Sequence, residues 1–329
     1  MRRYRVLISS AGRRVELMRC FRADAARLGM RLELMASDMN PTWSAACQES
    51  DACYRVPSCH APDFLDRLLD ICARHEVDLL VPTIDPEVEL LSRSAATFRA
   101  QGTDIAISSP AVVALARDKL QTAQFLRAQG IPVPRTLLPD EVVAASNWSW
   151  PAIVKPRSGS SSAGVQTIDS PAAFKAALPL AGYIAQELLE GQEYTVNLFF
   201  DPTGALRCAV PHLRYEVRAG EVSKGMTCRL EQLDAISRRL GQALSGARGA
   251  LCFQAMVDSR DRAAVFEINA RFGGGFPLAH RAGARFTQWL LEEMAGLPPS
   301  YSNAWRDRIK MLRYDAAVFV DHSDPVRSR

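Results

Sequence analysis

The sequence has no apolar run approaching the roughly 18 residues that a membrane-spanning helix needs, so we expect no membrane contact. The apolar stretch near the N-terminus is broken by Ser9 and ends before Arg13, which does not fit a secretory signal peptide. Charge of one sign is also scarce, because 40 basic and 36 acidic residues leave a net charge of only +4. This balance gives no indication of a nucleic-acid partner.

Cysteines are few and do not follow the spacing of a zinc site. The only cluster holds Cys47, Cys53 and Cys59 beside His60, with five residues between neighbouring cysteines. Zinc sites usually place about two to four residues between paired ligands. We therefore predict reduced, partly buried thiols and, without an export signal, a cytoplasmic protein.

Lysine is the scarcest charged residue. Only five of the 40 basic residues are lysine, namely Lys119, Lys155, Lys175, Lys224 and Lys310. A coding bias toward arginine explains the deficit. In such a background, a lysine that remains indicates a position where a compact ammonium group is needed.

The composition that is present is typical of a globular protein, with 48% hydrophobic and 23% charged residues. A length of 329 residues predicts about two domains. Short apolar runs at 6–8, 32–35, 79–81 and 105–107 alternate with amphipathic helical stretches. This alternation predicts βαβ units and a parallel sheet up to a domain boundary near residue 113.

Small or acidic polar residues follow each of these predicted strands, including Asp38 and Asp85. The carboxyl edge of an open parallel sheet is where ligands bind, although residues of these types are also ordinary helix caps. A nicotinamide-binding fingerprint is absent, because the first turn has one glycine, Gly12, where three are needed.

Beyond residue 113 the pattern changes. Residues after Pro110 predict one helix ending at Gly130, and antiparallel hairpins follow. An apolar strand ends at Lys155, and residues 157–165 are mostly glycine and serine. Such a segment is suited to close over phosphates as a lid, or is simply a flexible turn. No Gly-Lys dipeptide occurs, which excludes a Walker A loop.

Residues 253–258 and 264–269 predict paired strands. Side chains alternate along a strand, so Glu267 and Asn269 share one face and offer oxygen ligands to Mg²⁺, which Gln254 could complete. Arg271 and a run of three glycines follow, a combination suited to an anion.

The order of these motifs resembles the ATP-grasp superfamily over roughly residues 1–300. The nearest likeness is to the synthetase halves of the carbamoyl-phosphate synthetase large subunit and to related carboxylate–amine ligases. The motifs that carry the resemblance are Asp118-Lys119, Val154-Lys155-Pro156 with the Gly/Ser segment, Gln186–Leu189, Gly191–Glu193 and Phe266–Arg271. Ala270 stands where the family often has proline, and Gln254 where many members have an acid.

The resemblance implies an α/β and α+β fold in three parts. Residues 1–113 would form a parallel-sheet, Rossmann-like pre-ATP-grasp domain. Residues 114–185 would form the small ATP-grasp lobe with the lid. Residues 186–329 would form the large lobe with the metal site, and alternating apolar residues at 314–320 predict a C-terminal strand.

The resemblance also implies roles for individual residues. The residues implied to contact ATP are Lys119, Lys155, Ser158, Gly159, Ser160, Gly164, Gln186, Glu187, Leu188, Leu189, Glu193 and Lys224. Those implied to hold Mg²⁺, with Mn²⁺ as a substitute, are Gln254, Glu267 and Asn269. Those implied to contact substrate are Asp38, Asp85, Arg271, Gly274 and Gly275. Arg271 and Lys155 are the implied catalytic residues.

The resulting hypothesis is an ATP- and Mg²⁺-dependent ligase that activates a carboxylate as an acyl phosphate and joins it to an amine. The substrates would be small and amino-acid-like. The hypothesis is compatible with a homodimer. The alternatives are an ATP-binding regulatory module, or a phosphotransferase or carboxylase on the same fold.

Overall fold

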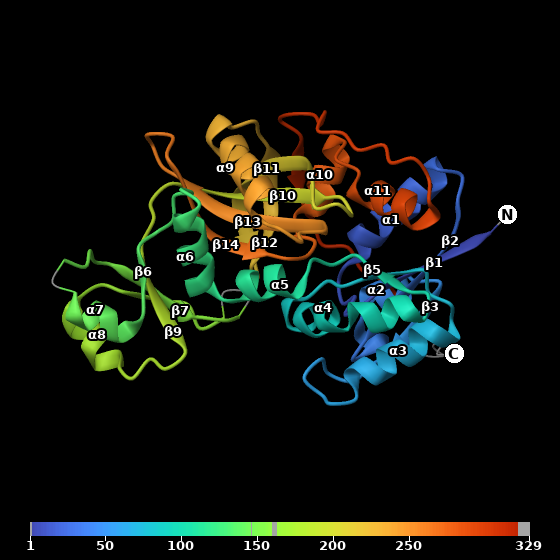
Figure 1. The fold of residues 1–329 in the computed structure, drawn as a ribbon, viewed down its shortest axis with the longest axis horizontal. Helices are drawn as coiled ribbons and strands as arrows, with labels where there is room; N and C mark the ends of the chain where they lie inside the picture. Colours follow the sequence, from blue (N-terminus) through green and yellow to red (C-terminus); the bar gives the residue numbers. More distant parts are fainter. Residues whose placement is uncertain (1, 146, 160–162, 322–329) are drawn as a thin grey trace.

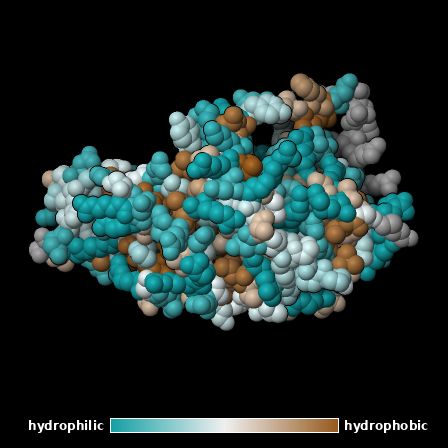
Figure 2. Space-filling model, turned by 90° about the horizontal axis from the view of Figure 1, so that it is seen from above, coloured by the Kyte–Doolittle hydropathy of each residue, from teal (hydrophilic) through white to brown (hydrophobic). Residues whose placement is uncertain are grey.

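The computed structural model describes residues 2–145, 147–159 and 163–321, which form three sheets with helices packed around them (Figure 1). Among the described residues, no helix combines the length and apolar character needed to cross a membrane. The face in Figure 2 is largely hydrophilic, and its hydrophobic residues gather only in small groups.

The first sheet is the predicted parallel one, in the order β3-β2-β1-β4-β5. Its strands are β1 (Arg3–Ile8), β2 (Arg31–Asp38), β3 (Ala52–Arg55), β4 (Leu79–Val81) and β5 (Asp104–Ile105). Its helices are α1 (Val15–Arg27), the 3₁₀ turn η1 (Pro41–Trp43), α2 (Ala45–Gln48), α3 (Phe64–Arg74) and α4 (Asp85–Ala100). The sequence analysis missed β3, because four residues without apolar alternation carry no strand signal.

A disulfide joins Cys47 of α2 to Cys53 of β3, so the prediction of reduced thiols is wrong for this pair. Helix α2 packs against β2 and β3 and brings the two Cα atoms to 5.3 Å, within the range for a disulfide. Sequence spacing could not show this packing. Cys59, the third member of the cluster, is a free, half-buried thiol.

The single helix predicted up to Gly130 is two helices, α5 (Pro110–Arg117) and α6 (Lys119–Ala128). Asp118 breaks them: its backbone is extended, and its Oδ1 accepts hydrogen bonds from the backbone N–H groups of Leu120 and Gln121. This cap makes Lys119 the first residue of α6. Arg157 pairs with the same carboxylate at 2.6 Å and thereby joins the start of α6 to the end of β7.

The second sheet is antiparallel, in the order β6-β9-β7-β8. Its strands are β6 (Thr136–Leu137), β7 (Ala152–Pro156), β8 (Gln166–Ile168) and β9 (Tyr183–Glu187), with helices α7 (Pro139–Ala144) and α8 (Pro171–Ala177). Trp148, Val154 and Phe174 belong to its own small core. Figure 1 shows this lobe at one end of the molecule, away from the parallel sheet.

The third sheet is antiparallel, in the order β14-β13-β10-β11-β12-β15. Its strands are β10 (Gln192–Phe200), β11 (Leu206–Arg218), β12 (Glu221–Thr227), β13 (Gly249–Val257), β14 (Ala263–Asn269) and β15 (Lys310–Leu312). Helices α9 (Glu231–Ala243), α10 (Phe276–Ala282) and α11 (Phe286–Ala295) accompany it. The predicted pairing of 253–258 with 264–269 is confirmed, and Gln254 lies opposite Glu267.

The predicted strand at 314–320 is wrong. The last strand is β15, which pairs with β12, and residues 313–321 have no regular structure. Tyr314 and Phe319 are 83% and 93% exposed. Apolar alternation predicts a strand only where a neighbouring surface covers one face, and these side chains have no such cover.

The first and third sheets share a core, which fixes how they face each other. Helix α1 packs against α10 and α11 (Figure 1), and one apolar cluster runs from Val6 and Phe21 to Phe276 and Trp289. Asp24 is fully buried at this junction and accepts hydrogen bonds from Arg285 and Thr287 at 2.9 and 2.5 Å. The domain boundaries at 113 and 185 stay predictions.

Candidate active site

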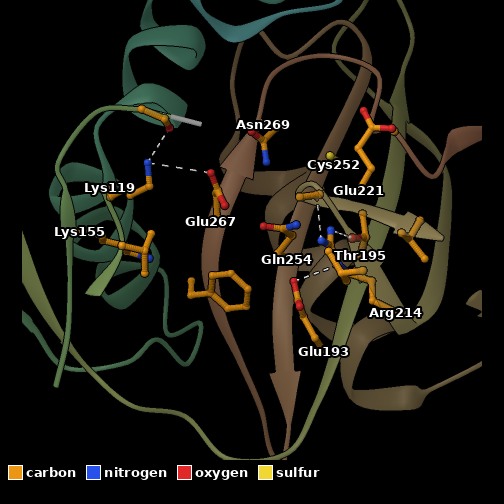
Figure 3. A pocket seen from close by; sticks show the side chains of 18 of the residues that line it. Lys119, Lys155, Glu193, Thr195, Arg214, Glu221, Cys252, Gln254, Glu267 and Asn269 are labelled. Carbon is orange, nitrogen blue, oxygen red and sulfur yellow. Dashed lines mark hydrogen bonds and ion pairs between the residues drawn. The ribbon is translucent and has the colours of Figure 1, made fainter. Parts of the chain in front are cut away.

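A cavity of about 450 Å³ lies between the second and third sheets, and the loop after β1 also contributes to its lining. Figure 3 shows part of this lining. Most of the residues that the sequence analysis singled out line the cavity. They are Lys119, Lys155, Gly159, Gln186, Glu187, Leu188, Leu189, Glu193, Gln254, Glu267, Asn269, Arg271, Gly274 and Gly275. Residues separated by up to 156 positions in the chain therefore meet at one place.

Two of the five lysines, Lys119 and Lys155, line this cavity. Lys119 Nζ donates to the carbonyl of Gly159 at 2.8 Å and lies 4.0 Å from Glu267 Oε1. Lys155, at the end of β7, is 7% exposed and sits 5.5 Å from the ring centre of Phe266. Burial lowers the pKa of Lys155 to about 8, and the charge of Lys119 acts in the same direction. A buried ammonium in this state is suited to receive an anion.

The affinity for ATP is expected to fall as the pH rises through about 8. Below that pH Lys155 is charged and attracts phosphate, whereas above it the amine is neutral in the free protein. Binding then requires uptake of a proton, so the affinity falls by up to about tenfold per pH unit. Calorimetric titration with Mg-ADP from pH 6.5 to 9.5 measures this change.

Lys155→Arg is the matched control for the pH profile, because its guanidinium stays charged throughout the range. Its affinity is expected to be lower than that of the native protein but to stay level with pH. A native profile that is also level would contradict the placement of Lys155 at the phosphates.

Glu267 and Asn269 lie on one face of β14 and point into the cavity, as the period of two predicts (Figure 3). Gln254 lies beside Glu267 on β13. When the side-chain amide of Gln254 is oriented so that both its nitrogen and its oxygen form hydrogen bonds, the NH₂ group donates to Glu267 Oε2 at 2.7 Å and the oxygen accepts from Arg214. In this arrangement Gln254 positions the Glu267 carboxylate, and its own oxygen is turned away.

These donors fit a magnesium ion. The described residues contain no cluster of three or more histidine, cysteine or acidic side chains that could hold a metal unaided. Mg²⁺ is commonly held by one or two carboxylates together with substrate phosphates and water. Glu267 with the Asn269 amide oxygen supplies that kind of partial set, next to the two lysines suited to phosphates.

Arg271 follows the metal strand and is held in a fixed position. Its Nε and Nη2 donate to the two oxygens of Asp85 at 2.9 and 2.6 Å, a bidentate pair between β14's end and the first turn of α4. Nη2 also lies 3.3 Å from Asn269 Oδ1. Asp85, expected to contact substrate, therefore has both oxygens engaged by Arg271.

Close approach explains the glycines that follow. A Cβ on Gly274 would lie 2.6 Å from Glu221 Cδ, and one on Gly275 would lie 2.5 Å from His212 Nε2. His212 is fully buried, and Nε2 has no hydrogen-bond partner among the described residues. Burial lowers the pKa of His212 to about 3, so its ring is neutral. The glycines let the chain lie directly on β11 and β12.

Gly275→Ala is expected to destabilise the fold by about 2 kcal/mol or more, because the added methyl meets a buried ring that cannot move into solvent. The backbone of Gly275 is at φ −84°, which alanine adopts freely, so the effect comes from packing alone. Chemical denaturation measures it. Gly204→Ala is the comparison variant, because Gly204 has a positive φ but a Cβ there would have its nearest contact at 3.7 Å. It measures the smaller cost of the backbone conformation without a clash. Equal effects at both positions would contradict the packing argument.

The segment Gln186–Leu189 lies where β9 ends and the two antiparallel sheets meet. Gln186 is 3% exposed and donates to Thr136 Oγ1 at 2.9 Å. Glu187 Oε2 accepts from the backbone N–H of Arg135 at 3.0 Å. Because these side chains bind within the lobe, the groups left to face the cavity are mainly backbone ones. Glu193 also lines the cavity and pairs with Arg214 at 3.0 Å.

Five of the expected residues that the structure describes do not line the cavity, and one of them is Asp85, which reaches it only through its pair with Arg271. Asp38 accepts from the backbone N–H groups of Gly12 and Asn40, which makes it a turn-stabilising residue. Lys224 is exposed and pairs with Glu216 at 2.6 Å. Ser158 and Gly164 are exposed and do not line the cavity. Ser160 falls outside the described residues, together with positions 161 and 162 of the expected lid.

The sequence analysis missed several charged residues of the cavity, namely Arg13, Arg14, Arg214 and Glu221. Arg14 belongs to the loop after β1, and Arg214 lies on β11. No motif marks them, because in a chain with 35 arginines a single arginine carries no signal. The packing of the first sheet against the third brings Arg13 and Arg14 to the site, whereas Arg214 and Glu221 lie on strands of the third sheet.

Comparison with known protein families gives two matches along the chain. Residues 6–106 match the PylC-like N-terminal domain, and residues 116–275 match the ATP-grasp domain.

Curated relatives include the D-alanine–D-alanine ligase of Chromohalobacter salexigens, which is 31% identical over 175 residues. That alignment covers 47% of this chain and 55% of the relative, so the chain spans about half the length of the curated proteins it matches. A second such ligase, from Stutzerimonas stutzeri, is 32% identical over 202 residues, which are 54% of this chain and 64% of the relative.

Solved structures show the same fold at low identity. The L-amino acid ligase from Bacillus licheniformis has a TM-score of 0.66 at 18% identity, and the match covers 91% of this chain and 76% of the ligase chain. The biotin carboxylase domain of 2-oxoglutarate carboxylase from Hydrogenobacter thermophilus, solved with Mg-ADP and bicarbonate, has a TM-score of 0.74 at 14% identity. The match covers 93% of this chain and 73% of the carboxylase chain.

Proposed function

Since the chain belongs to the ATP-grasp superfamily and has a PylC-like N-terminal domain, we propose that it is an ATP-dependent ligase that joins a carboxylate to an amine. The observation that carries the proposal is the arrangement in one cavity of Lys119, Lys155, Glu267, Asn269 and Arg271. The similarity to D-alanine–D-alanine ligases supports amino-acid-like substrates.

The chemistry begins with activation of the carboxylate. A carboxylate is a poor electrophile, because its leaving group would be oxide. One of its oxygens attacks the γ-phosphorus of ATP, the bond from that phosphorus to the bridging oxygen breaks, and ADP leaves. The product is an acyl phosphate. Transfer of this kind depends mainly on positioning and on positive charge around the equatorial oxygens.

The chain supplies that charge from two sides. Lys119 and Lys155 face the cavity from the α6 and β7 side (Figure 3). Arg271 lines it just after the end of β14. Asp85 holds the Arg271 guanidinium in a single orientation, which reduces the reorganisation needed at the moment of transfer. Mg²⁺, held by Glu267 and Asn269, would add positive charge at the phosphates.

The second step forms the amide. The amine nitrogen attacks the acyl carbon, the bond from that carbon to the phosphate oxygen breaks, and the nitrogen loses a proton. Water would compete with the amine, so the cavity must exclude it. The Gly/Ser segment 157–165, described only as far as Gly159 and from Ala163 onward, borders the cavity at both described ends.

We carry the remaining expectations forward as part of the proposal. Residues 1–113, 114–185 and 186–329 act as pre-ATP-grasp domain, small lobe and large lobe. Mn²⁺ substitutes for Mg²⁺, and the protein acts in the cytoplasm on small molecules. The proposal is compatible with a homodimer.

The test is release of ADP and phosphate from Mg-ATP with amino acids supplied alone and in pairs, with mass spectrometry of the products. A ligase requires two substrates and yields a product lighter than their sum by one water. Nucleotide binding without release for any pair would contradict the proposal and favour the regulatory alternative. Release with a phosphorylated or carboxylated product would favour the phosphotransferase or carboxylase.

A further inference from the structure

A second charged cluster lies at the end of the cavity away from the lysines. Arg13 and Arg14 from the loop after β1 and Glu221 at the start of β12 line the cavity. Arg313, which follows β15, joins them through Glu221 and the carbonyl of the lining residue Gly274. Figure 3 shows Glu221 across the cavity from the two lysines. The first domain and the large lobe thus both contribute to this cluster, which we call the arginine cluster.

Glu221 holds the arginines together. Its Oε1 lies 3.0 Å from Arg14 Nη1 and 3.7 Å from Arg13 Nη2, and its Oε2 lies 2.9 Å from Arg313 Nη1. Arg313 also donates to the carbonyl of Gly274, which lines the cavity. Glu221 packs so closely on Gly274 that any side chain there would displace it. The guanidinium groups of Arg14 and Arg313 are therefore fixed on either side of one carboxylate.

The cluster carries more positive than negative charge. Among the described residues, three guanidinium groups share the single carboxylate of Glu221, an excess of two positive charges. The pKa of Arg14 is lowered, first by burial and then by the charges of Arg271, Arg13 and Arg313, against the opposing effect of Glu221. Arg271, by contrast, is matched one to one by Asp85. A partly buried excess of this kind is stabilised by a bound anion.

We propose that Arg14 and Arg313 bind a non-reacting carboxylate of the amine substrate, so that this substrate is an amino acid and not a simple amine. The inference rests on the proposed function. The reacting carboxylate must lie at the phosphate end, beside the lysines and Glu267. A carboxylate bound at the opposite end therefore belongs to a group that is not activated, and the planar guanidinium fork matches its two oxygens.

The test compares α-amino acids with their α-carboxamides, which keep the amine and lose only the negative charge. Calorimetric titrations in the presence of Mg-ADP measure both affinities for each pair. For the amino acid that the native protein binds most tightly, the acid is expected to bind at least about tenfold more tightly than the amide. In Arg313→Met and Arg14→Met this ratio is expected to fall to near one.

Lys310→Met is the matched control, since it removes a cation from the exposed side of β15, three residues from Arg313. It is expected to keep the native ratio. Thermal unfolding of each variant establishes that the fold is retained. Because the Arg313 side chain is 32% exposed, Arg313→Met is the variant that disturbs buried packing less. A ratio that persists in both arginine variants, or that is near one in the native protein, would overturn the proposal.

O-Phosphoserine and serine provide a further comparison, because a phosphate would also satisfy two positive charges. Tighter binding of O-phosphoserine, lost in the arginine variants, would assign the cluster to a phosphate and overturn the carboxylate. Failure of the proposed function is distinguishable from these results. The absence of any ligated product would refute the ligase, whereas the acid-to-amide ratio reports on the arginine cluster without turnover.

Discussion

Glu267→Gln is expected to lower kcat/KM for ATP-dependent ligation by at least about 100-fold, a loss of about 3 kcal/mol or more in transition-state stabilisation. The substitution keeps the size of the side chain and the contact from Gln254, but it removes the negative charge next to Lys119. An uncharged amide binds Mg²⁺ more weakly than a carboxylate, and the site would then hold no charged ligand from the protein. Coupled-enzyme measurement of ADP release against Mg²⁺ concentration gives both the rate and the metal requirement.

Glu231→Gln, at the exposed start of α9, removes the same charge far from the cavity and is expected to leave the rate unchanged. A Glu267→Gln protein that retained native turnover at the native Mg²⁺ requirement would show that the metal is held elsewhere. If turnover recovered at high Mg²⁺, the residue would be confirmed as a ligand, because the defect would then lie in metal affinity.

Lys155→Met is expected to have two large effects of opposite sign. Turnover falls by orders of magnitude, while the free energy of unfolding without nucleotide rises by about 3 kcal/mol at pH 7. The second effect follows from the pKa of about 8 for an amine that ordinarily titrates at 10.5, because that difference measures the cost of charging the buried group. Methionine keeps the unbranched shape and the contact with Phe266 without the charge.

The pH dependence of the same measurement has a definite sign. The unfolded chain keeps the lysine proton until about pH 10.5, whereas in the folded chain the pKa of Lys155 is about 8, so the native protein gains stability as the pH rises between these values. Lys155→Met lacks this gain, so its advantage disappears by about pH 10.5. Urea denaturation at several pH values measures it, with the exposed Lys310→Met as control. A destabilised Lys155→Met at pH 7 would contradict the cost assigned to the buried charge.

Local periodicity predicted where Lys155, Glu267 and Asn269 lie on their strands, whereas their proposed roles at the phosphates and the metal were implied by the resemblance to the ATP-grasp superfamily. Glu267 and Asn269 share a face in any strand that includes both, and Lys155 ends an apolar run that has to be a strand. The parallel first sheet could likewise be predicted from the alternation of strands and helices. These features depend on neighbouring residues in the chain.

What could not be predicted depends on contacts between distant parts. Asp38 and Asp85 look alike in sequence, each following a predicted strand, yet Asp38 stabilises a turn and Asp85 reaches an arginine 186 residues away. The pairing of Arg14 with Glu221 needs the shared core of the first and third sheets. The break at Asp118 is supported by Arg157, which pairs with the capping carboxylate from 39 residues further along the chain.

The scarcity of lysine has a consequence for chemical labelling. An acyl group delivered on a nucleotide would be presented to Lys119 and Lys155, the two lysines that line the cavity, while Lys175, Lys224 and Lys310 are exposed elsewhere. Because the pKa of Lys155 is about 8, a large part of its amine is unprotonated and nucleophilic in mildly alkaline buffer. A chain so rich in arginine, which such reagents leave unmodified, would give a peptide map with very little background.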